Sequence, residues 1–443
     1  MRVHHIEVRP HVQGCNASLR LRHSSGELTD GGGLLLVRRL WDQLDLGGWL
    51  QGQTGEIGGR FRSPLMVELW IVLLLYGGGF MDDLKLLAMR GVRRLFGWAR
   101  IPDPTTFGRW LRRGGEPLVG VLDRLLWLLV QCRWQAAGVP PQLMLVLDST
   151  VVLRYGTKQA GAEVGYNPKK HGRPSHHPLV AYAAETGDCL GVVWRPGSAH
   201  TAAGAIAWLR TLVGRLRGLG VQEITVRLDK GFFSQEMIEA LRELGVWFYL
   251  KLPEHTWVLR KLGSWRQSEK EPRIWTATGE LYGARLLACE WRLPRPPRPD
   301  ELRIDSYEVE KRALVLTNEP GVHALTAWRT YNRGAVVEQH IAELGQLALG
   351  RTAVDDLGGN KLLWALGAVA YQVLHVIRTT ALRGSWRRAQ PARLRAWLFR
   401  LPGKFTRHAR KEYVQLVRGE PVRKELLSAL RELSALARLP RAA

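Results

Sequence analysis

Two aspartates in this chain each end an apolar run that has no helical period. Asp148 closes the run Leu143-Met-Leu-Val-Leu-Asp148, and Asp229 closes Ile224-Thr-Val-Arg-Leu-Asp229. Such runs are typical of buried strands in a mostly parallel sheet, whose carboxyl ends open onto a common crevice. Two carboxylates there raise each other's pKa unless a cation lies between them, and hard oxygen ligands favour Mg2+ or Mn2+. The pair indicates a divalent-metal site, although aspartate at a strand end is also a common turn residue.

A third carboxylate is expected from the helical sequence that follows residue 329. Glu338 lies at the edge of an apolar stripe formed by Val337, Ile341 and Leu344, and not on the opposite, fully solvated side. Glu343, five residues later, is expected to point elsewhere and to lie at the surface. Glu338 is therefore the candidate that completes a set of three acids.

The elements that must position these acids alternate between strands and helices. Strands are expected at 143–148, 179–183, 189–194, 224–229 and 246–251, with helices at 202–218 and 234–244. This pattern predicts an α/β core. Sequence before the core reads as helical from residue 31 to about 139, short β-like runs occupy 253–317, and the pattern from 329 to the end is helical.

Net charge points to a polyanionic partner. The 443 residues include 64 Lys and Arg against 40 Asp and Glu, which gives a formal charge of +24. Between Arg378 and Arg441 there are 17 Lys or Arg and 4 Glu. Such a surplus favours nucleic acid as the partner and marks the C-terminal tail as a candidate DNA-binding region.

Several other classes of protein are disfavoured. Cys15, Cys132, Cys189 and Cys289 lie far apart without a Cys-x-x-Cys pair, so neither a zinc site nor a disulfide framework is expected. The N-terminus lacks a signal-peptide pattern, so we expect the chain to stay in the cell. The apolar stretches 64–81 and 362–377 fall short of the roughly 20 apolar residues of a spanning helix, so we expect buried core helices.

Three segments together resemble a known family. Leu147-Asp-Ser-Thr-Val151, Arg227-Leu-Asp-Lys-Gly-Phe232 and the stretch from Tyr331 to Leu344 are similar, in order and spacing, to DDE transposases of bacterial insertion sequences. The branch in question carries a β insertion before the glutamate, and the resemblance covers about residues 31–378.

The resemblance implies a fold class and its division into regions. The expected fold is α/β, with an RNase H-like catalytic core, a β-rich insertion and flanking helical regions. The expected boundaries are a helical N-terminal DNA-binding region at 1–140, the core at 141–252 and 329–378, the insertion at 253–328, and a basic helical C-terminal region at 379–443.

The resemblance also implies the chemistry. Asp148, Asp229 and Glu338 become the catalytic residues and the ligands of two Mg2+ or Mn2+ ions, with no nucleotide cofactor. These ions would support strand cleavage at transposon ends and strand transfer into target DNA, by a homodimer or higher multimer. The expected location is the bacterial cytoplasm, on the nucleoid when bound to DNA. The alternative is a decayed or repurposed copy that binds DNA without cutting it.

The chain departs from the branch signature at three positions. Tyr331 and Glu338 match, but Arg333 comes one residue before the place of the signature arginine. Gly345 replaces a lysine that would hold a terminal phosphate of the DNA, and Lys230 stands where a small polar residue is usual. Lys230 is one candidate to replace the missing lysine, and Arg351 is another.

A basic loop, Pro168-Lys-Lys-His-Gly-Arg-Pro-Ser-His-His177, lies between strands of the core. Its histidines suggest a metal site, but a phosphate-contacting loop is favoured because no cysteine or helical histidine spacing supports zinc. Residues expected to contact DNA are Lys169, Lys170, Arg173, Lys230, Tyr331 and Arg333. Asp355 and Asp356 could form another acid pair, although a helix cap in a solvated turn is favoured.

Overall fold

The structure, a computed structural model, describes residues 28–55, 59–89, 91–156, 158–165, 167, 170–269, 271–294, 307–333, 336–347, 353–416 and 422–439. Its α-helices are α1 (Leu35–Leu44), α2 (Leu46–Thr54), α3 (Ser63–Tyr76), α4 (Leu84–Met89), α5 (Val92–Phe96), α6 (Pro104–Ala137), α7 (Ala205–Gly218), α8 (Gln235–Glu243), α9 (Thr256–Leu259), α10 (Ala324–Arg333), α11 (Val336–Gln346), α12 (Leu357–Val376), α13 (Pro391–Leu394) and α14 (Arg423–Ser434). Its strands are β1 (Leu28–Thr29), β2 (Gln142–Ser149), β3 (Val152–Leu153), β4 (Glu163–Val164), β5 (Pro174–His176), β6 (Leu179–Ala183), β7 (Cys189–Val193), β8 (Glu223–Leu228), β9 (Trp247–Lys251), β10 (Arg266–Gln267), β11 (Ile274–Leu281), β12 (Ala284–Pro294), β13 (Tyr307–Thr317), β14 (Gly403–His408) and β15 (Lys411–Leu416).

The core sheet has the strand order β7-β6-β2-β8-β9. β8 and β9 run parallel to β2, β6 is antiparallel to β2, and β7, which is antiparallel to β6, again runs in the direction of β2. A five-stranded sheet in which only the strand after the first is reversed is RNase H-like, which confirms the expected core. Four of the five core strands point the same way, as expected for a mostly parallel sheet, and β6 is reversed because the short turn between β6 and β7 permits only antiparallel pairing.

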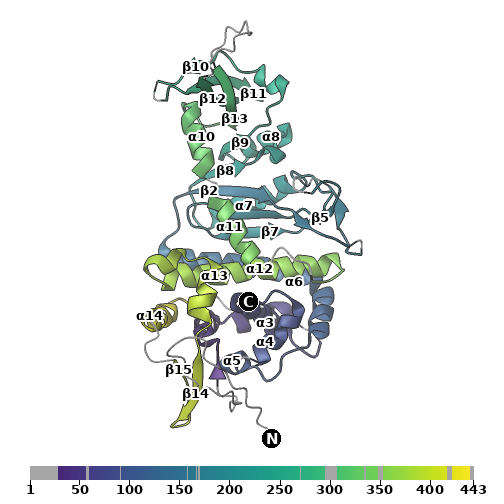
Figure 1. Ribbon diagram of the computed structural model, residues 1–443, viewed down its shortest axis with the longest axis vertical. Coiled ribbons are helices and arrows are strands. Elements are labelled where there is room, and N and C mark those ends of the chain that lie inside the picture. Colours follow the sequence, from purple (N-terminus) through teal and green to yellow (C-terminus); the bar gives the residue numbers. More distant parts are fainter. Residues whose placement is uncertain are drawn as a thin grey trace, which may run out of the picture.

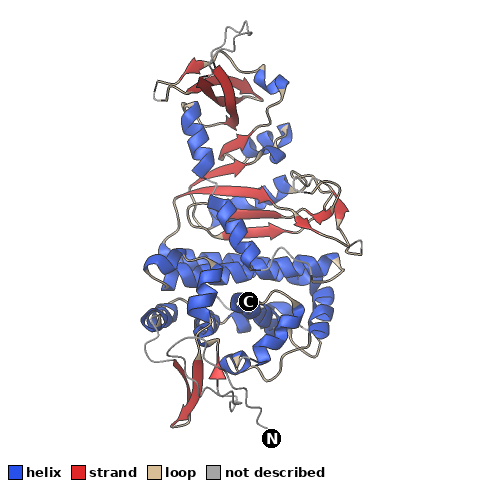
Figure 2. Cartoon of the chain, viewed as in Figure 1, coloured by secondary structure: helices blue, strands red, loops and turns tan. Residues whose placement is uncertain are grey.

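The β-rich segment continues this sheet. β13 pairs with β9 through Val315 and Lys251, and β12, β11 and β10 follow outward to give nine strands in all. Figures 1 and 2 show the insertion at one end of the long axis, the core sheet in the middle, and the helical body at the other end.

The two faces of β2 pack against different layers. Leu143, Leu145 and Leu147 belong to the apolar cluster that includes α7 and α8. Met144 and Val146 belong to the cluster that includes α12 and α3. Since side chains alternate along a strand, Asp148 shares the face of Met144 and Val146.

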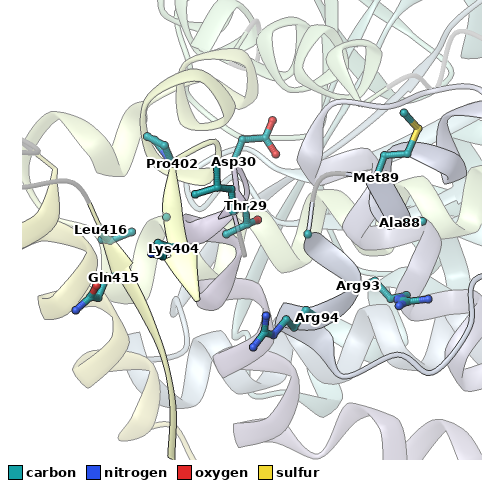
Figure 3. A pocket seen from close by; sticks show the side chains of 13 residues that line it. Thr29, Asp30, Ala88, Met89, Arg93, Arg94, Pro402, Lys404, Gln415 and Leu416 are labelled. Atoms are coloured by element: carbon teal, nitrogen blue, oxygen red, sulfur yellow. The ribbon is translucent and has the colours of Figure 1, made fainter. Parts of the chain in front are cut away.

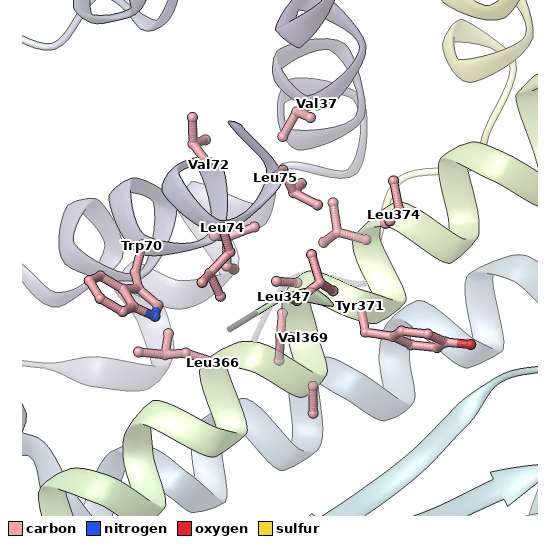
Figure 4. Close-up of a cluster of buried hydrophobic side chains, with 14 of the residues drawn as sticks. Val37, Trp70, Val72, Leu74, Leu75, Leu347, Leu366, Val369, Tyr371 and Leu374 are labelled. Atoms are coloured by element: carbon pink, nitrogen blue, oxygen red, sulfur yellow. The ribbon is translucent and has the colours of Figure 1, made fainter. Parts of the chain in front are cut away.

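The helical body is organised around α12, which is almost wholly buried. Figure 4 shows Leu74 and Leu75 of α3 near Leu366 and Val369 of α12. By length and composition one described helix, Leu357–Ala381, could cross a membrane, but 94% of its apolar window is buried inside the protein. The interpretation of both apolar stretches as core helices is confirmed.

A close approach of backbones joins α12 to the bent helix α6. Gly115 has non-helical backbone angles, which break α6 into two segments. A Cβ atom on Gly115 would lie 3.3 Å from the backbone of Gly358 at the start of α12. Glycine at both positions therefore lets the helices meet at the kink.

Helix starts follow the capping chemistry of the sequence with one correction. Ser234 accepts a hydrogen bond from the backbone N–H of Met237, as expected for the cap of α8. The sequence Pro104-Thr105-Thr106 predicts a helix start capped by threonine, and this cap is wrong: Asp103 caps α6 by accepting from the backbone N–H of Thr106 at 2.9 Å. An acid directly before Pro104 is better placed, because the cap must precede the first helical residue.

The sequence pattern predicts a helical C-terminal region, and this prediction is wrong for residues 403–416. β14 and β15 form a hairpin, and β1 adds to β14 by pairing Leu28 with Lys404. Leu398, Phe399 and Leu433 of this region are buried in the main apolar cluster. The basic tail is therefore part of the folded body, and removing it would expose the core.

Among the described residues four buried histidines make stability sensitive to acid, and burial lowers the pKa of His177 as it does that of the other three. Burial lowers the pKa of His176 and of His340 to about 4, and that of His375 to about 3. In the unfolded chain these rings take up protons near pH 6.5. Between about pH 6.5 and 4 these rings bind more protons in the unfolded state, so their contribution to stability falls as pH falls. The raised pKa values of Glu68 and Asp148 act in the opposite direction, so the histidine contribution is measured as a difference between variants.

We expect the free energy of unfolding to drop by up to about 1.4 kcal/mol per pH unit for each buried histidine in this range. His176→Phe keeps a ring against Trp194, whose centroid lies 4.5 Å away, and should flatten the slope measured by urea unfolding at several pH values. The exposed His171→Phe is the matched control, with an unchanged slope expected. Equal slopes in wild type and His176→Phe would contradict this account.

Candidate active site

Strand register brings the two predicted aspartates together. β2 and β8 are parallel, and Leu147 pairs with Leu228, so Asp148 and Asp229 follow a matched pair on neighbouring strands. Val226 and Leu228 point to the cluster with α7 and α8, which leaves Asp229 on the opposite face. Both carboxylates therefore emerge at the same end and on the same face of the sheet.

The third acid lies on α11, which packs on that face. Val337 and Leu344 of α11 are buried in the same cluster as Met144 and Val146, while Glu338 is exposed near the start of the helix. The apolar stripe predicted from the sequence is confirmed. It presents Glu338 toward the strand ends where the aspartates lie.

Glu343 corrects the sequence-based prediction of a surface position. Its side chain is 1% exposed and accepts a hydrogen bond at 2.9 Å from Arg378, which is also buried. His340 adds a second attachment, because its Nδ1 lies 3.0 Å from the hydroxyl of Tyr371 on α12. α11 is thus fixed to the helical body by buried polar contacts whose partners lie far away in sequence.

Electrostatics shows that the three acids are neighbours. Burial raises the pKa of Asp148 to about 6, opposed by a hydrogen bond from the backbone N–H of Ser149 at 2.7 Å. The negative charges of Asp229 and Glu338 raise this pKa further, and the positive charge of Arg227 lowers it. Asp148 therefore carries the cost of a concentrated negative charge.

The three carboxylates are ligands that a hard divalent cation prefers, although their side chains do not lie close enough together to coordinate one ion. Among the described residues no group of three His, Cys, Asp or Glu is close enough to hold a metal ion as it stands. The donors are carboxylate oxygens, which Mg2+ and Mn2+ prefer, and a cation between them would favour the charged form of Asp148, whose pKa is raised mainly by burial and further by Asp229 and Glu338.

Arg227 is a site residue that the sequence analysis missed. Its Nε donates to the carbonyl oxygen of Tyr331 at 2.9 Å, and its guanidinium lies 4.3 Å from the centre of the Tyr331 ring. The Tyr331 hydroxyl in turn lies 3.4 Å from Oδ1 of Asp229. A signal was available: Arg227 is two residues before Asp229, so an alternating strand places both on one face.

The residues expected to contact DNA fall into different environments. Lys170, Arg173, Lys230 and Arg333 are exposed, whereas Lys169 lies outside the described residues. Lys170 donates to the hydroxyl of Tyr155 at 2.8 Å on the small sheet formed by β3, β5 and β4, which follows β2 directly. All four cations are exposed and are therefore accessible to a polyanion.

Tyr331 is placed differently from that expectation. It is 3% exposed, and its ring stacks near that of Trp328 with a centroid distance of 6.1 Å. In this position its hydroxyl reaches Asp229, while its ring offers little surface to a DNA base. Tyr331 thus contacts Asp229 through its hydroxyl and does not offer its ring to DNA.

The remaining sequence candidates are structural. His176 and His177 are buried, and His177 Nδ1 lies 2.9 Å from the carbonyl oxygen of Ala199, so neither histidine faces a phosphate. Asp356 caps α12 through the backbone N–H of Gly359 at 2.5 Å, and the exposed Asp355 pairs with Arg112 at 2.8 Å. The cap interpretation of this acid pair is confirmed.

Gly345 lies on the exposed side of α11. A Cβ atom built there would meet nothing within 4 Å. A lysine at this position would therefore fit without moving the helix, two turns beyond Glu338 on the same face. Arg351, the other candidate to replace that lysine, lies outside the described residues.

Comparison with known proteins places the chain in a family context. The sequence profile described as transposase DDE domain group 1 matches residues 12–438. A search of curated proteins finds no match. Among solved structures, the cryo-EM structure of a piggyBac transposase synaptic complex with hairpin DNA is similar, with a TM-score of 0.42 and 14% identity over 83% of this chain and 80% of that chain.

Divalent-cation binding should depend on the protonation of Asp148. Because its pKa is about 6, we expect Mn2+ affinity, measured by calorimetry, to fall as pH is lowered from 7 to 5. Asp148→Asn should bind Mn2+ weakly at every pH, whereas Asp355→Asn, which removes an exposed acid elsewhere, should behave as wild type. Affinity that does not change with pH in the wild type would exclude Asp148 as a ligand.

Proposed function

The chain belongs to the family of transposases with a DDE domain, and from this premise we propose that Asp148, Asp229 and Glu338 are its catalytic residues. A family profile that spans almost the whole described chain establishes a DNA-cleaving and strand-transferring enzyme that uses divalent metal ions. The observation that carries the residue assignment is the register of β2 on β8, with α11 packed across the same face.

The proposed activity is cleavage at transposon ends followed by strand transfer into target DNA. We infer that the three carboxylates hold two Mg2+ or Mn2+ ions. Bound there, such ions would activate the attacking oxygen and stabilise the leaving oxygen of an in-line phosphodiester displacement.

The protein's own residues orient this site. Arg227 holds Tyr331 by its carbonyl oxygen and ring, and Tyr331 supports Asp229, so these two act as positioning residues. The pair Glu343 and Arg378 sets the position of α11, and with it that of Glu338. The backbone N–H of Ser149 holds one oxygen of Asp148.

DNA is the partner, and the basic surface supplies the contacts. Lys170, Arg173, Lys230 and Arg333 are exposed cations that we assign to DNA phosphates, with Lys169 as a further candidate from the sequence. Action on two DNA ends favours a homodimer or higher multimer. We propose a location in the bacterial cytoplasm, on the nucleoid when the protein is bound to DNA.

The alternative of a copy that binds DNA without cutting it is not favoured. Its supporting feature was Gly345 in place of a lysine. The three acids are all present, and the charges of Asp229 and Glu338 both act on Asp148, although burial is the main reason for its raised pKa.

Loss of any one acid should abolish cleavage while DNA binding persists. Because loss of a residue that merely orients a metal ligand costs up to about 100-fold, Asp148→Ala, Asp229→Ala and Glu338→Ala should each lower the nicking rate by more than about 100-fold. Gel shifts should show nearly wild-type DNA affinity, since phosphate contacts lie elsewhere. Asp356→Ala would be a poor control because it removes a cap, so the exposed Asp355→Ala serves instead. Near-normal cutting by one acid variant would remove that residue from the site.

Gly345→Lys should raise the affinity of the protein for cleaved DNA ends. The side chain has open space on the face of α11 that carries Glu338, so its charge can reach a terminal phosphate. Binding of cleaved ends and of random duplex should be compared, with a gain expected only for the ends. Gly345→Ala is the control, because glycine weakens a helix by roughly 1 kcal/mol relative to alanine. An equal gain from alanine would contradict phosphate contact.

A further inference from the structure

The hairpin of β14 and β15 has two chemically different faces. Cross-strand pairs place side chains on a common face, and alternate pairs lie on opposite faces. One face carries Phe405, Arg407, Glu412 and Val414. The other, here called the outer face, carries Lys404, Thr406, His408, Lys411, Tyr413 and Gln415.

The first face attaches the hairpin to the helical body. Phe405 is 3% exposed, and the guanidinium of Arg94 on α5 lies 4.4 Å from the centre of its ring. The same guanidinium pairs with Glu412, and Arg94 Nε lies 3.1 Å from a Glu412 oxygen. These contacts, together with the pairing of β1 on β14, fix the direction in which the hairpin projects (Figure 1).

The outer face is directed away from the body. All of its side chains are exposed except that of Thr406, which is partly buried, and Tyr413 is 46% exposed. Two lysines and a histidine are present without an acid, and every one of the six side chains can donate or accept a hydrogen bond. A solvated strand face of this kind is cationic and rich in hydrogen-bonding groups along its whole length.

The turn adds a cation at the tip. His408 pairs with Lys411, so Ala409 and Arg410 form a two-residue loop, with φ of 47° and 63°. Positive φ at both central residues is typical of a type I′ turn, where Asn-Gly is preferred because alanine and arginine are strained there. The strained turn presents Arg410 at the end of the hairpin.

A pocket lies at the root of the same hairpin. Its volume is about 770 Å3, and its lining includes Lys404 and Gln415 from the outer face, Arg93 and Arg94 from α5, and Asp30 (Figure 3). Because Arg94 is paired with Glu412, Lys404 and Arg93 carry the positive charge that this pocket can offer to a polyanion.

We propose that the outer face of the β14–β15 hairpin lies in the major groove of duplex DNA, with the root pocket facing the adjacent phosphates. This inference rests on the proposed function, which supplies DNA as the partner. The major groove, about 12 Å wide, admits a two-stranded ribbon, and its base edges offer the donors and acceptors that such side chains recognise. The hairpin thus contacts base edges and phosphates of DNA at a place separate from the three acids.

The test uses the full chain and a random duplex, compared with a duplex that carries the ends of the element. His408→Ala combined with Lys411→Ala should lower affinity by about 10- to 100-fold and reduce the salt slope by about 1. Wild type should protect guanine N7 in the major groove from methylation, and the double variant should lose this protection. Arg407→Ala removes a cation from the opposite face of the same strand and should change affinity less than about threefold.

A second pair of variants separates folding from contact. Ala409→Asn favours the turn and keeps Arg410, so DNA affinity should stay at the wild-type value. Adding Arg410→Gly favours the turn further but removes the tip cation, so affinity should fall although the hairpin is more stable. Parallel thermal unfolding of each variant checks that stability does not fall.

The outcomes distinguish this inference from the proposed function. Wild-type binding and cutting with unchanged affinity in the double variant would overturn the hairpin proposal alone. Lost affinity without any major-groove protection in the wild type would overturn the groove assignment. A wild-type chain that neither binds duplex DNA nor cuts it with a divalent metal would overturn both.

Discussion

The burial of Asp148 beside two further carboxylates is the constraint on which the rest of this structure depends. Asp148 and Asp229 are held side by side because β2 pairs in parallel with β8, and burial raises the pKa of Asp148 to about 6. Left to themselves, such side chains would separate in water. Apolar packing on both faces of the sheet fixes the strands, so Asp148 and Asp229 stay at the same end of neighbouring strands. A bound cation would stabilise the charged carboxylates, and the packed strands hold Asp148 and Asp229 in place before it binds.

Buried polar contacts also hold α11, the helix that carries Glu338, in a fixed position. Glu343 and Arg378 join α11 to the end of the α12 segment, and Arg133 of α6 pairs with Asp188 in the turn before β7. Asp188 also accepts from Gln372 of α12 at 2.7 Å. Breaking a buried pair by removing one partner typically costs about 3–5 kcal/mol, because the remaining charge is left uncompensated. Helix α11, which carries Glu338, is therefore tied to the same network that joins the sheet to the helical body.

The basic C-terminal region has two roles in this arrangement. Its apolar residues complete the helical body, as Leu398 and Phe399 show, while its cations lie on the surface. The charge surplus is thus carried by a folded platform and not by a loose tail. A fixed platform can hold a DNA duplex in one orientation relative to the acids, which a flexible polycation could not do.

The sequence by itself determined the α/β class from local signals, since Asp148 and Asp229 end apolar strands and Glu338 borders a helical stripe. The RNase H-like core and the transposase family followed from the resemblance of three segments taken together, and the catalytic role of the three acids stays a prediction. Only the tertiary structure decided what depends on distant partners. Glu343 is buried because Arg378 lies opposite it, Tyr331 is buried beneath Arg227, and the insertion joins the core sheet because β13 pairs with β9. The hairpin of β14 and β15 escaped the helical pattern because its stability comes from β1 and α5, and no local period encodes contacts with segments that are more than 300 residues away.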